Sequence, residues 1–152
     1  MREESGRSLI EVIGFMAVAA LMTVSSVGIY NTIRKNQLRT IANAEMSQLV
    51  ENTKLLMENY GTFEGVSIDY LIKAGALKSN KAPIGGEGWS VTASVDGKSF
   101  SINLIDLSAS DCNYFSATLP KWANTMLVNG FETVTANNCF DSATNQISFI
   151  IE

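Results

Sequence analysis

The chain has 152 residues, of which 46% are hydrophobic and 17% charged, which is enough for one small domain and a membrane span. The net charge of −4 argues against a general nucleic-acid-binding surface, although a nucleic acid partner is not excluded. Because the sequence contains no histidine, His-based catalytic triads and His-ligated metal sites are absent.

The first predicted element is an apolar helix. From Val12 to Ile33, 22 residues carry no formal charge, and at helical rise this length crosses a hydrocarbon core about 30 Å thick. Cationic residues that can reach the membrane interfaces flank the run: Arg7, Arg34, Lys35 and Arg39. Glu11 lies just inside it. A carboxylate near the end of a membrane helix either has a partner or is an interfacial residue that suits the helix dipole.

The residues before the apolar run decide between these two interpretations. Met1–Gly6 is short and charged, Arg7 follows, and Glu11 lies five residues beyond Gly6. This block resembles the class III signal of type IV pilins and pseudopilins, in which a prepilin peptidase cuts after a glycine. The resemblance implies a cut between Gly6 and Arg7 and N-methylation of the new terminus at Arg7. It also implies that Glu11 pairs with the terminal amine of a neighbouring subunit during assembly.

The sequence departs from the family pattern at two positions. Arg7 stands where phenylalanine or methionine usually follows the cut, and Gly28 stands where many members carry proline. A conventional secretory signal fits less well, because it has a shorter apolar region followed by a small-residue cleavage site. An uncleaved single-pass anchor that presents an extracytoplasmic binding module is the alternative, and it requires neither the Gly6–Arg7 junction nor Glu11.

Helical periodicity continues beyond the apolar run. No proline interrupts Ser8 to Tyr60, and Gly61 is a suitable stop. The second half, residues 34–60, is amphipathic and is expected to lie along a globular part. Its predicted apolar stripe consists of Leu38, Ile41, Ala42, Met46, Leu49, Val50, Leu56, Met57 and Tyr60.

Residues 61–152 predict a small α+β head. Turn and capping residues delimit two short helices and alternating residues mark the strands. The predicted elements are a helix over Ser67–Gly75, a glycine loop over Gly85–Gly88, a hairpin over Trp89–Leu104 with Val95 in its first strand, a helix over Ser108–Leu119, a hairpin over Thr125–Val134 and a strand over Gln146–Ile151. Three to five antiparallel strands suffice for a sheet that covers the helix.

Cys112 and Cys139 are the only cysteines, with 26 residues between them. In a cytosolic protein, two free thiols would be the better interpretation. Behind a membrane anchor a disulfide is favoured, and it would stabilise the head by about 3.5 kcal/mol through loop closure. It would also place residues 36–152 outside the cytoplasm, whereas a count of flanking positive charges gives the opposite orientation. Type IV pilins commonly carry such a disulfide-bounded region near the C-terminus.

The expected fold is therefore a long N-terminal helix packed on a small antiparallel sheet, in a layout nearest to the type IVb-like pilins. The segments are a leader at 1–6, a membrane and polymerisation helix at 7–33, its amphipathic continuation at 34–60 and the head at 61–152. Trp89, Trp122, Tyr114 and Phe115 are expected in the core, and Asp106, Asp111 and Asp141 at the surface or in caps.

The expected function is that of a filament subunit, whether a major pilin, a minor pilin or a pseudopilin. Its expected partners are copies of itself or related subunits, the prepilin peptidase, the inner-membrane assembly machinery and, before assembly, membrane lipid. It is expected in the bacterial inner membrane first and in an extracellular or periplasmic filament afterwards. No enzymatic activity, catalytic residue, cofactor or metal is expected.

Overall fold

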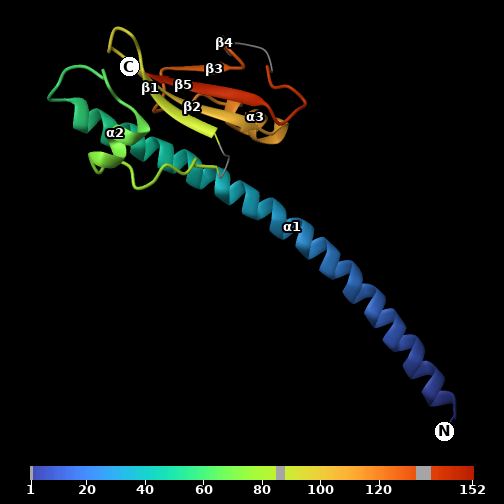
Figure 1. Ribbon diagram of the computed structural model, residues 1–152. Helices are drawn as coiled ribbons and strands as arrows, with labels where there is room; N and C mark the ends of the chain where they lie inside the picture. The colour runs from blue at the N-terminus through green and yellow to red at the C-terminus, as the bar shows by residue number, and fades with distance from the viewer. Residues whose placement is uncertain (1, 85–87, 133–137) are drawn as a thin grey trace. The chain divides into compact units, whose positions relative to one another are not determined.

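The computed structural model describes residues 2–84, 88–132 and 138–152. They form three helices and five strands, in the order α1 (Arg2–Met57), α2 (Ile68–Lys73), β1 (Gly88–Ala93), β2 (Phe100–Leu107), α3 (Ala109–Ser116), β3 (Thr125–Val128), β4 (Phe131–Glu132) and β5 (Asn145–Ile151) (Figure 1). The strands form one antiparallel sheet in the order β1-β2-β5-β3-β4. The predicted α+β class is confirmed. The chain divides into two compact units, residues 1–38 and residues 39–152.

Helix α1 ends at Met57, three residues before the predicted end at Tyr60. The amides of Tyr60 and Gly61 both donate to the Met57 carbonyl, at 3.0 and 3.1 Å. Gly61 has φ +67°, a left-handed conformation that glycine adopts without strain. Gly61 therefore ends the helical segment as predicted, but residues 58–60 before it form a turn that is not α-helical.

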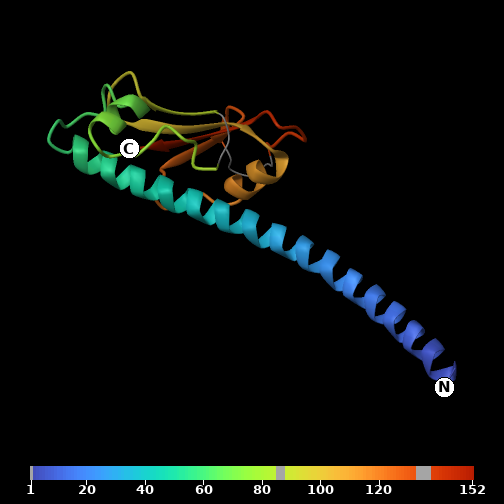
Figure 2. The same ribbon diagram turned by 60° about the horizontal axis from the view of Figure 1, so that its bottom comes forward.

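The core of the second unit lies between the C-terminal part of α1 and one face of the sheet (Figure 2). Helical spacing brings one face of α1 into it, and alternation brings every second residue of the central strands. The buried residues of these elements are Ala42, Met46, Leu49, Val50, Thr53 and Met57 of α1, Phe100, Ile102, Leu104 and Leu107 of β2, and Asn145, Ile147, Phe149 and Ile151 of β5. The buried hydroxyl of Thr53 donates to the Leu49 carbonyl at 2.7 Å, so it remains satisfied within the helix.

The predicted apolar stripe of α1 is broader than the face that the sheet covers. Leu38 and Ile41 are 50% and 51% exposed, and Tyr60 lies beyond the helix and is 68% exposed. The sequence shows which residues are apolar, whereas the width of the sheet determines which of them become buried.

The predicted first hairpin is present, with Trp89 opposite Leu104 and Val91 opposite Ile102. The Ser94 hydroxyl and the Lys98 amide both donate to Asp96 Oδ1, at 2.6 and 3.2 Å. These hydrogen bonds, the one from Ser94 above all, hold the pKa of the Asp96 carboxyl below its ordinary value. Val95 does not belong to the strand as expected. It is fully exposed, because β1 ends at Ala93 and the chain already turns at Ser94.

The remaining elements follow the prediction with slightly different bounds, and β5 begins one residue earlier than predicted, at Asn145. Ser67 caps α2 and Ser108 caps α3 through their side-chain oxygens, and α3 ends at Ser116, before the expected Leu119. The second hairpin turns at Asn129 and Gly130, which both have positive φ. Residues 133 and 134 of that predicted hairpin, and residues 85–87 of the predicted glycine loop, lie outside the described residues.

Candidate functional site

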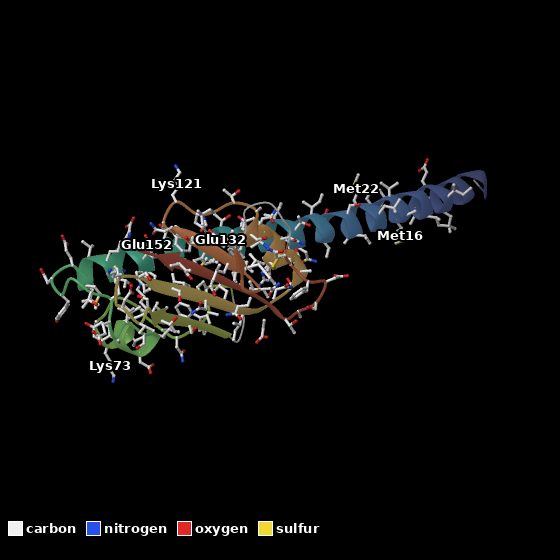
Figure 3. All side chains as sticks on the ribbon, turned by 90° about the horizontal axis from the view of Figure 1, so that it is seen from above. Met16, Met22, Lys73, Lys121, Glu132 and Glu152 are labelled. Carbon is white, nitrogen blue, oxygen red and sulfur yellow. A yellow bond between two sulfur atoms is a disulfide. The ribbon has the colours of Figure 1, made fainter. Side chains whose placement is uncertain are left out.

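Residues 8–38 of α1 form an exposed apolar helix. Every one of them is exposed, including Ile10 at 74% and Phe15 at 76%, and Figure 3 shows the Met16 and Met22 side chains extending from this part of the helix. Its most apolar window has a mean hydropathy of 2.1, and by length and composition the helix can cross a membrane. A soluble protein would bury such a surface, so this stretch requires an apolar environment that the chain itself does not supply.

The hydroxyl groups of this stretch are satisfied within the helix. Four side chains donate to the carbonyl four residues earlier, at 2.7–3.1 Å: Thr23, Ser25, Ser26 and Thr32. Such bonds compete weakly with the helical ladder in water, but in an apolar medium they remove the cost of an unpaired hydroxyl. The small polar residues therefore do not prevent the stretch from being surrounded by lipid or by other helices.

Of the predicted processing and assembly residues, Gly6 and Arg7 lie within α1, and Glu11 follows about one turn later. The Glu11 side chain is exposed, and none of the described residues forms a hydrogen bond or ion pair with its carboxylate. It is the only acidic residue between Ser8 and Ile33. Within this helix the carboxylate is thus available to a partner from outside the chain.

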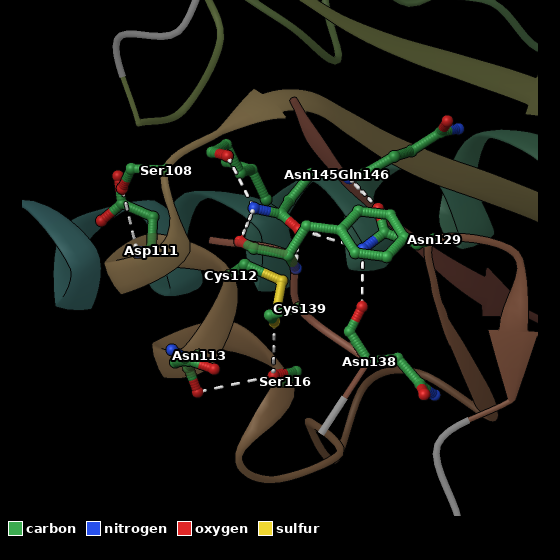
Figure 4. The surroundings of a disulfide bond; sticks show 12 residues. Ser108, Asp111, Cys112, Asn113, Ser116, Asn129, Asn138, Cys139, Asn145 and Gln146 are labelled. Carbon is green, nitrogen blue, oxygen red and sulfur yellow. Dashed lines mark hydrogen bonds between the residues drawn. A yellow bond between two sulfur atoms is a disulfide. The ribbon is translucent and has the colours of Figure 1, made fainter. Parts of the chain in front are cut away.

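Cys112 and Cys139 form a disulfide, with 1.99 Å between the sulfurs and 5.9 Å between the Cα atoms (Figure 4). Cys112 is fully buried in α3, and Cys139 lies in the segment that leads to β5. The Ser116 hydroxyl lies 3.5 Å from the Cys139 sulfur. The bridge therefore attaches the segment before β5 to α3, at the C-terminal side of the head.

Asn145 holds the same segment by hydrogen bonds. It is fully buried, and its Nδ2 lies 2.9 Å from the Phe140 and Ser142 carbonyls and 3.2 Å from the Leu107 carbonyl. Its Oδ1 accepts from the Phe140 amide at 2.6 Å and from Asn129 Nδ2 at 3.0 Å. A single side chain thus connects the end of β2, the loop before β5 and the second hairpin.

Asn129 completes this network from the turn of the second hairpin. Its φ is +50°, a left-handed conformation that asparagine tolerates better than most residues. Asn129 Nδ2 donates to the Asn138 carbonyl at 2.7 Å, and its Oδ1 accepts from the Gln146 amide at 2.9 Å. Sequence reasoning identified the Asn129–Gly130 turn but not this role, because turn chemistry alone does not show what the amide side chain contacts.

Arg39 belongs to the second unit, although the sequence suggested a membrane-flanking role for it. Its Nε donates to Asp111 Oδ1 at 2.9 Å and its Nη2 to the Ser110 hydroxyl at 2.6 Å. Its guanidinium lies 5.0 Å from the centre of the Tyr114 ring. These three residues of α3 leave the Arg39 side chain only 13% exposed. Asp111, expected at the surface or in a cap, lies in the first turn of α3 and also binds α1.

The four aromatic residues expected in the core occupy three kinds of site. Phe115 is buried, whereas Trp89 and Trp122 are partly buried at the edge of the core. Trp122 donates from Nε1 to Asn43 Oδ1 at 3.2 Å. Tyr114 is 42% exposed, contrary to expectation, because it lies on the outer side of α3 against Arg39.

Within residues 8–84, 88–132 and 138–152, no three histidine, cysteine, aspartate or glutamate residues are grouped so that they could hold a metal ion. Asp106 and Asp141 are both exposed, and Asp106 has φ +56° in the irregular end of β2. The features that remain are an unpartnered apolar helix and a head with a rigid disulfide region.

A search of solved structures finds a similar fold in TcpA, a type IV pilin from the El Tor biotype of Vibrio cholerae. The two chains share 12% identity, the match covers 76% of this chain and 99% of that chain, and the TM-score is 0.60. The chain has the type IV pilin fold. No protein-family model matches the sequence, and no curated protein matches it significantly. At this identity the likeness establishes the fold alone.

Proposed function

We propose that the chain is a structural subunit of a type IV pilus or of a related pseudopilus. In this proposal it is inserted in the inner membrane as a prepilin, is cut after Gly6 by a prepilin peptidase and joins a filament through its N-terminal helix. The observation that carries the proposal is the exposed apolar surface of residues 8–38 on a chain with the pilin fold. The remaining segments keep their proposed roles, with the leader at 1–6, the helix at 7–33 and 34–60, and the head at 61–152.

The same helix would serve in two environments. In the membrane, lipid covers residues 8–33, and in the filament the corresponding helices of other subunits cover them. In both states the apolar surface is kept from water, so transfer from one to the other does not expose it. Between helices in an apolar medium, packing and polar contacts decide the arrangement, since lipid is as apolar as the helix surface.

The proposed polar contact joins Glu11 to the terminal amine of Arg7 on a neighbouring subunit. A buried carboxylate without a partner is strongly disfavoured, whereas an opposite charge at hydrogen-bonding distance offsets much of its desolvation. The pairing would therefore select one axial register between adjacent helices. This role is supported by the exposure of Glu11 and by the absence of a partner for its carboxylate among the side chains of residues 8–57 of α1.

The test is Glu11→Ala in the cells that produce the protein, with Glu51→Ala as the control because Glu51 is also an exposed acid on α1. N-terminal sequencing and intact mass report processing, and the sheared surface fraction reports assembly. We expect Glu11→Ala to begin at Arg7 as the wild type does, yet to yield about tenfold fewer filaments or none. The control should assemble normally.

Two results would contradict the proposal in different ways. Normal filaments from correctly processed Glu11→Ala protein would remove the assembly role of Glu11 and leave the filament proposal in place. A wild-type chain that still begins at Met1 in mature membranes would contradict the prepilin itself. That second result would instead favour the uncleaved anchor with an extracytoplasmic binding module.

A further inference from the structure

The second unit contains a cleft of about 640 Å³ between α1 and the segment that joins α2 to β1. All the residues that line it belong to the second unit, between Glu45 and Trp89. Its volume lies within the range of about 300 to 1,000 Å³ that is usual for small-molecule sites. Neither the helix in the membrane nor the disulfide region contributes to it, so the filament proposal leaves it without a role.

One wall of the cleft is cationic and rich in free donors. Lys78 and Lys81 line it, and both are exposed and form no ion pair with any described residue. The backbone amides of residues 78–82 likewise have no hydrogen-bond partner in the part of the chain that the structure describes. Ammonium groups beside unpaired amides are the groups that bind a carboxylate or another anion.

The opposite wall is formed by α1 and has a different chemistry. Gln48 and Asn52 lie one helical turn apart on it, with Glu45 at the preceding position of the same face. Amide side chains donate hydrogen bonds to hydroxyl groups and accept from them, the Glu45 carboxylate accepts from them, and its charge repels a second anion. An occupant should therefore be anionic on the side of Lys78 and Lys81 and rich in hydroxyls on the side of α1.

Trp89 supplies the aromatic part of the lining. The indole is held in place, because its Nε1 donates to the Asn80 carbonyl at 2.7 Å. Asn52 Nδ2 similarly donates to the Ala76 carbonyl at 3.3 Å and fastens the loop wall to the helix wall. An aromatic ring with one edge bonded and its body in a cleft is suited to the apolar face of a ring-shaped ligand. Both contacts are made within the chain, so they hold the two walls of the cleft together.

We propose that this cleft binds a carboxylated pyranose, that is, a uronic or similar acidic sugar residue of a glycan. The sugar carboxylate would bind Lys78, Lys81 and the neighbouring amides. Its hydroxyls would face Gln48 and Asn52, and one ring face would lie against Trp89. A peptide carboxylate would satisfy the cationic wall alone, which leaves the α1 wall and the indole unused, so the saccharide fits the whole cleft better. The site is independent of the filament proposal.

The test uses the full chain in a detergent without a sugar head group, with calorimetric titration and saturation-transfer NMR. Methyl β-glucuronide is the probe, and methyl β-glucoside, which carries a hydroxymethyl group in place of the carboxylate, is its matched partner. N-acetylglutamate amide represents a peptide carboxylate.

The variants are Lys78→Gln with Lys81→Gln, and Gln48→Ala. Lys121→Gln is the control, because Lys121 lies on the opposite side of the head from Lys73 of α2 (Figure 3) and outside the cleft. Thermal unfolding verifies the fold of each.

We expect the glucuronide to bind about tenfold or more tightly than the glucoside, with the difference falling as salt rises. The double lysine variant should abolish this difference, Gln48→Ala should weaken both sugars, and Lys121→Gln should change nothing. Absence of glucuronide binding at millimolar concentration would overturn the proposal, as would binding that the lysine changes leave intact. N-acetylglutamate amide that binds as tightly as the glucuronide would overturn it in favour of an acidic peptide.

Discussion

Asn145 shows how one buried polar residue can organise a surface region. Residues 138–144, just before β5, contain no helix or strand, so their backbone groups are not paired with one another as those of regular structure are. The Asn145 side chain accepts a hydrogen bond from the Phe140 backbone amide and donates one to the Phe140 carbonyl. The disulfide fixes the adjacent Cys139. The exposed Phe140 side chain is consequently presented by a loop held at successive residues.

We predict that Asn145→Ala lowers the free energy of unfolding by about 3 kcal/mol, because it removes a buried hydrogen bond to the Leu107 carbonyl and partly buried ones to backbone groups of Phe140 and Ser142. Denaturant unfolding of the detergent-solubilised chain measures the change. Asn113→Ala is the matched control, since Asn113 is exposed on α3, and it should alter stability by less than about 0.5 kcal/mol. Equal effects of the two substitutions would mean that the Asn145 network contributes no stability.

Residues differ in how far the sequence reveals their role. Cys112 and Cys139 could be paired in advance because cysteine has few functions and the membrane context implied an oxidising compartment. The roles of Asn145 and of Lys78 could not be predicted, since asparagine and lysine are ordinary surface residues whose significance depends on neighbours distant in the chain. Gly6, Arg7 and Glu11 form a local motif, so they could be proposed from the sequence, and their roles stay predictions.

At the scale of elements, the contact between Arg39 and α3 links the helix to the disulfide region. Arg39 is the first residue of the second unit, and Asn43 one turn later binds Trp122 just beyond α3. Two successive turns of α1 thus hold α3 and the segment that follows it by side-chain hydrogen bonds. Because α3 also carries Cys112, the docking of α3 and the position of the disulfide are coupled.

A double-mutant cycle with Arg39→Gln and Asp111→Asn tests this docking. We expect each single change to destabilise the protein by about 1 kcal/mol, the partial exposure of Asp111 limiting the effect. The double variant should lose about 0.5 to 1 kcal/mol less stability than the sum of the two single losses, as for residues in direct contact. Chemical denaturation at low ionic strength gives the four free energies. Strict additivity would show that the ion pair does not contribute in solution.

Periodicity and turn residues predicted which elements exist, and tertiary packing decided where they stop. The alternation at Trp89–Ala93 and Phe100–Leu104 reflects a sheet with one buried face, so the hairpin could be predicted. Val95 continues that alternation by chance, and the hydrogen bonds of the Asp96 turn remove it from the strand. The strand order also depends on long-range pairing between β2, β5 and β3 that no local pattern encodes.

At the scale of the molecule, the apolar residues are divided between two kinds of environment. The core of the second unit begins at Ala42 and includes residues of every later element except β4. Residues 8–38 contribute no buried side chain to any part of the described structure. The head therefore has a hydrophobic core of its own, a disulfide and a complete sheet, which are the requirements for independent folding of a small domain.

We predict that a chain starting at Arg34 folds alone and is soluble without detergent, whereas the full chain requires detergent. The fragment retains the amphipathic half of α1, Arg39 and both cysteines, and loses the apolar surface between Val12 and Ile33. Analytical ultracentrifugation should find a monomer, circular dichroism should show helix and strand with one cooperative thermal transition, and intact mass should rise by two protons on reduction.

A fragment starting at Ala44 is the informative comparison, since it lacks Arg39, Ala42 and Asn43 but keeps the rest of the buried face of α1. It should fold less stably than the fragment from Arg34, because it loses the docking of α3 as well as part of the core. If the fragment from Arg34 were instead aggregated or unfolded, the apolar helix would be needed for folding as well as for the membrane and filament. The two compact units would then be one cooperative structure, and the proposed transfer of the helix from lipid to filament would have to preserve the head through contacts outside residues 39–152.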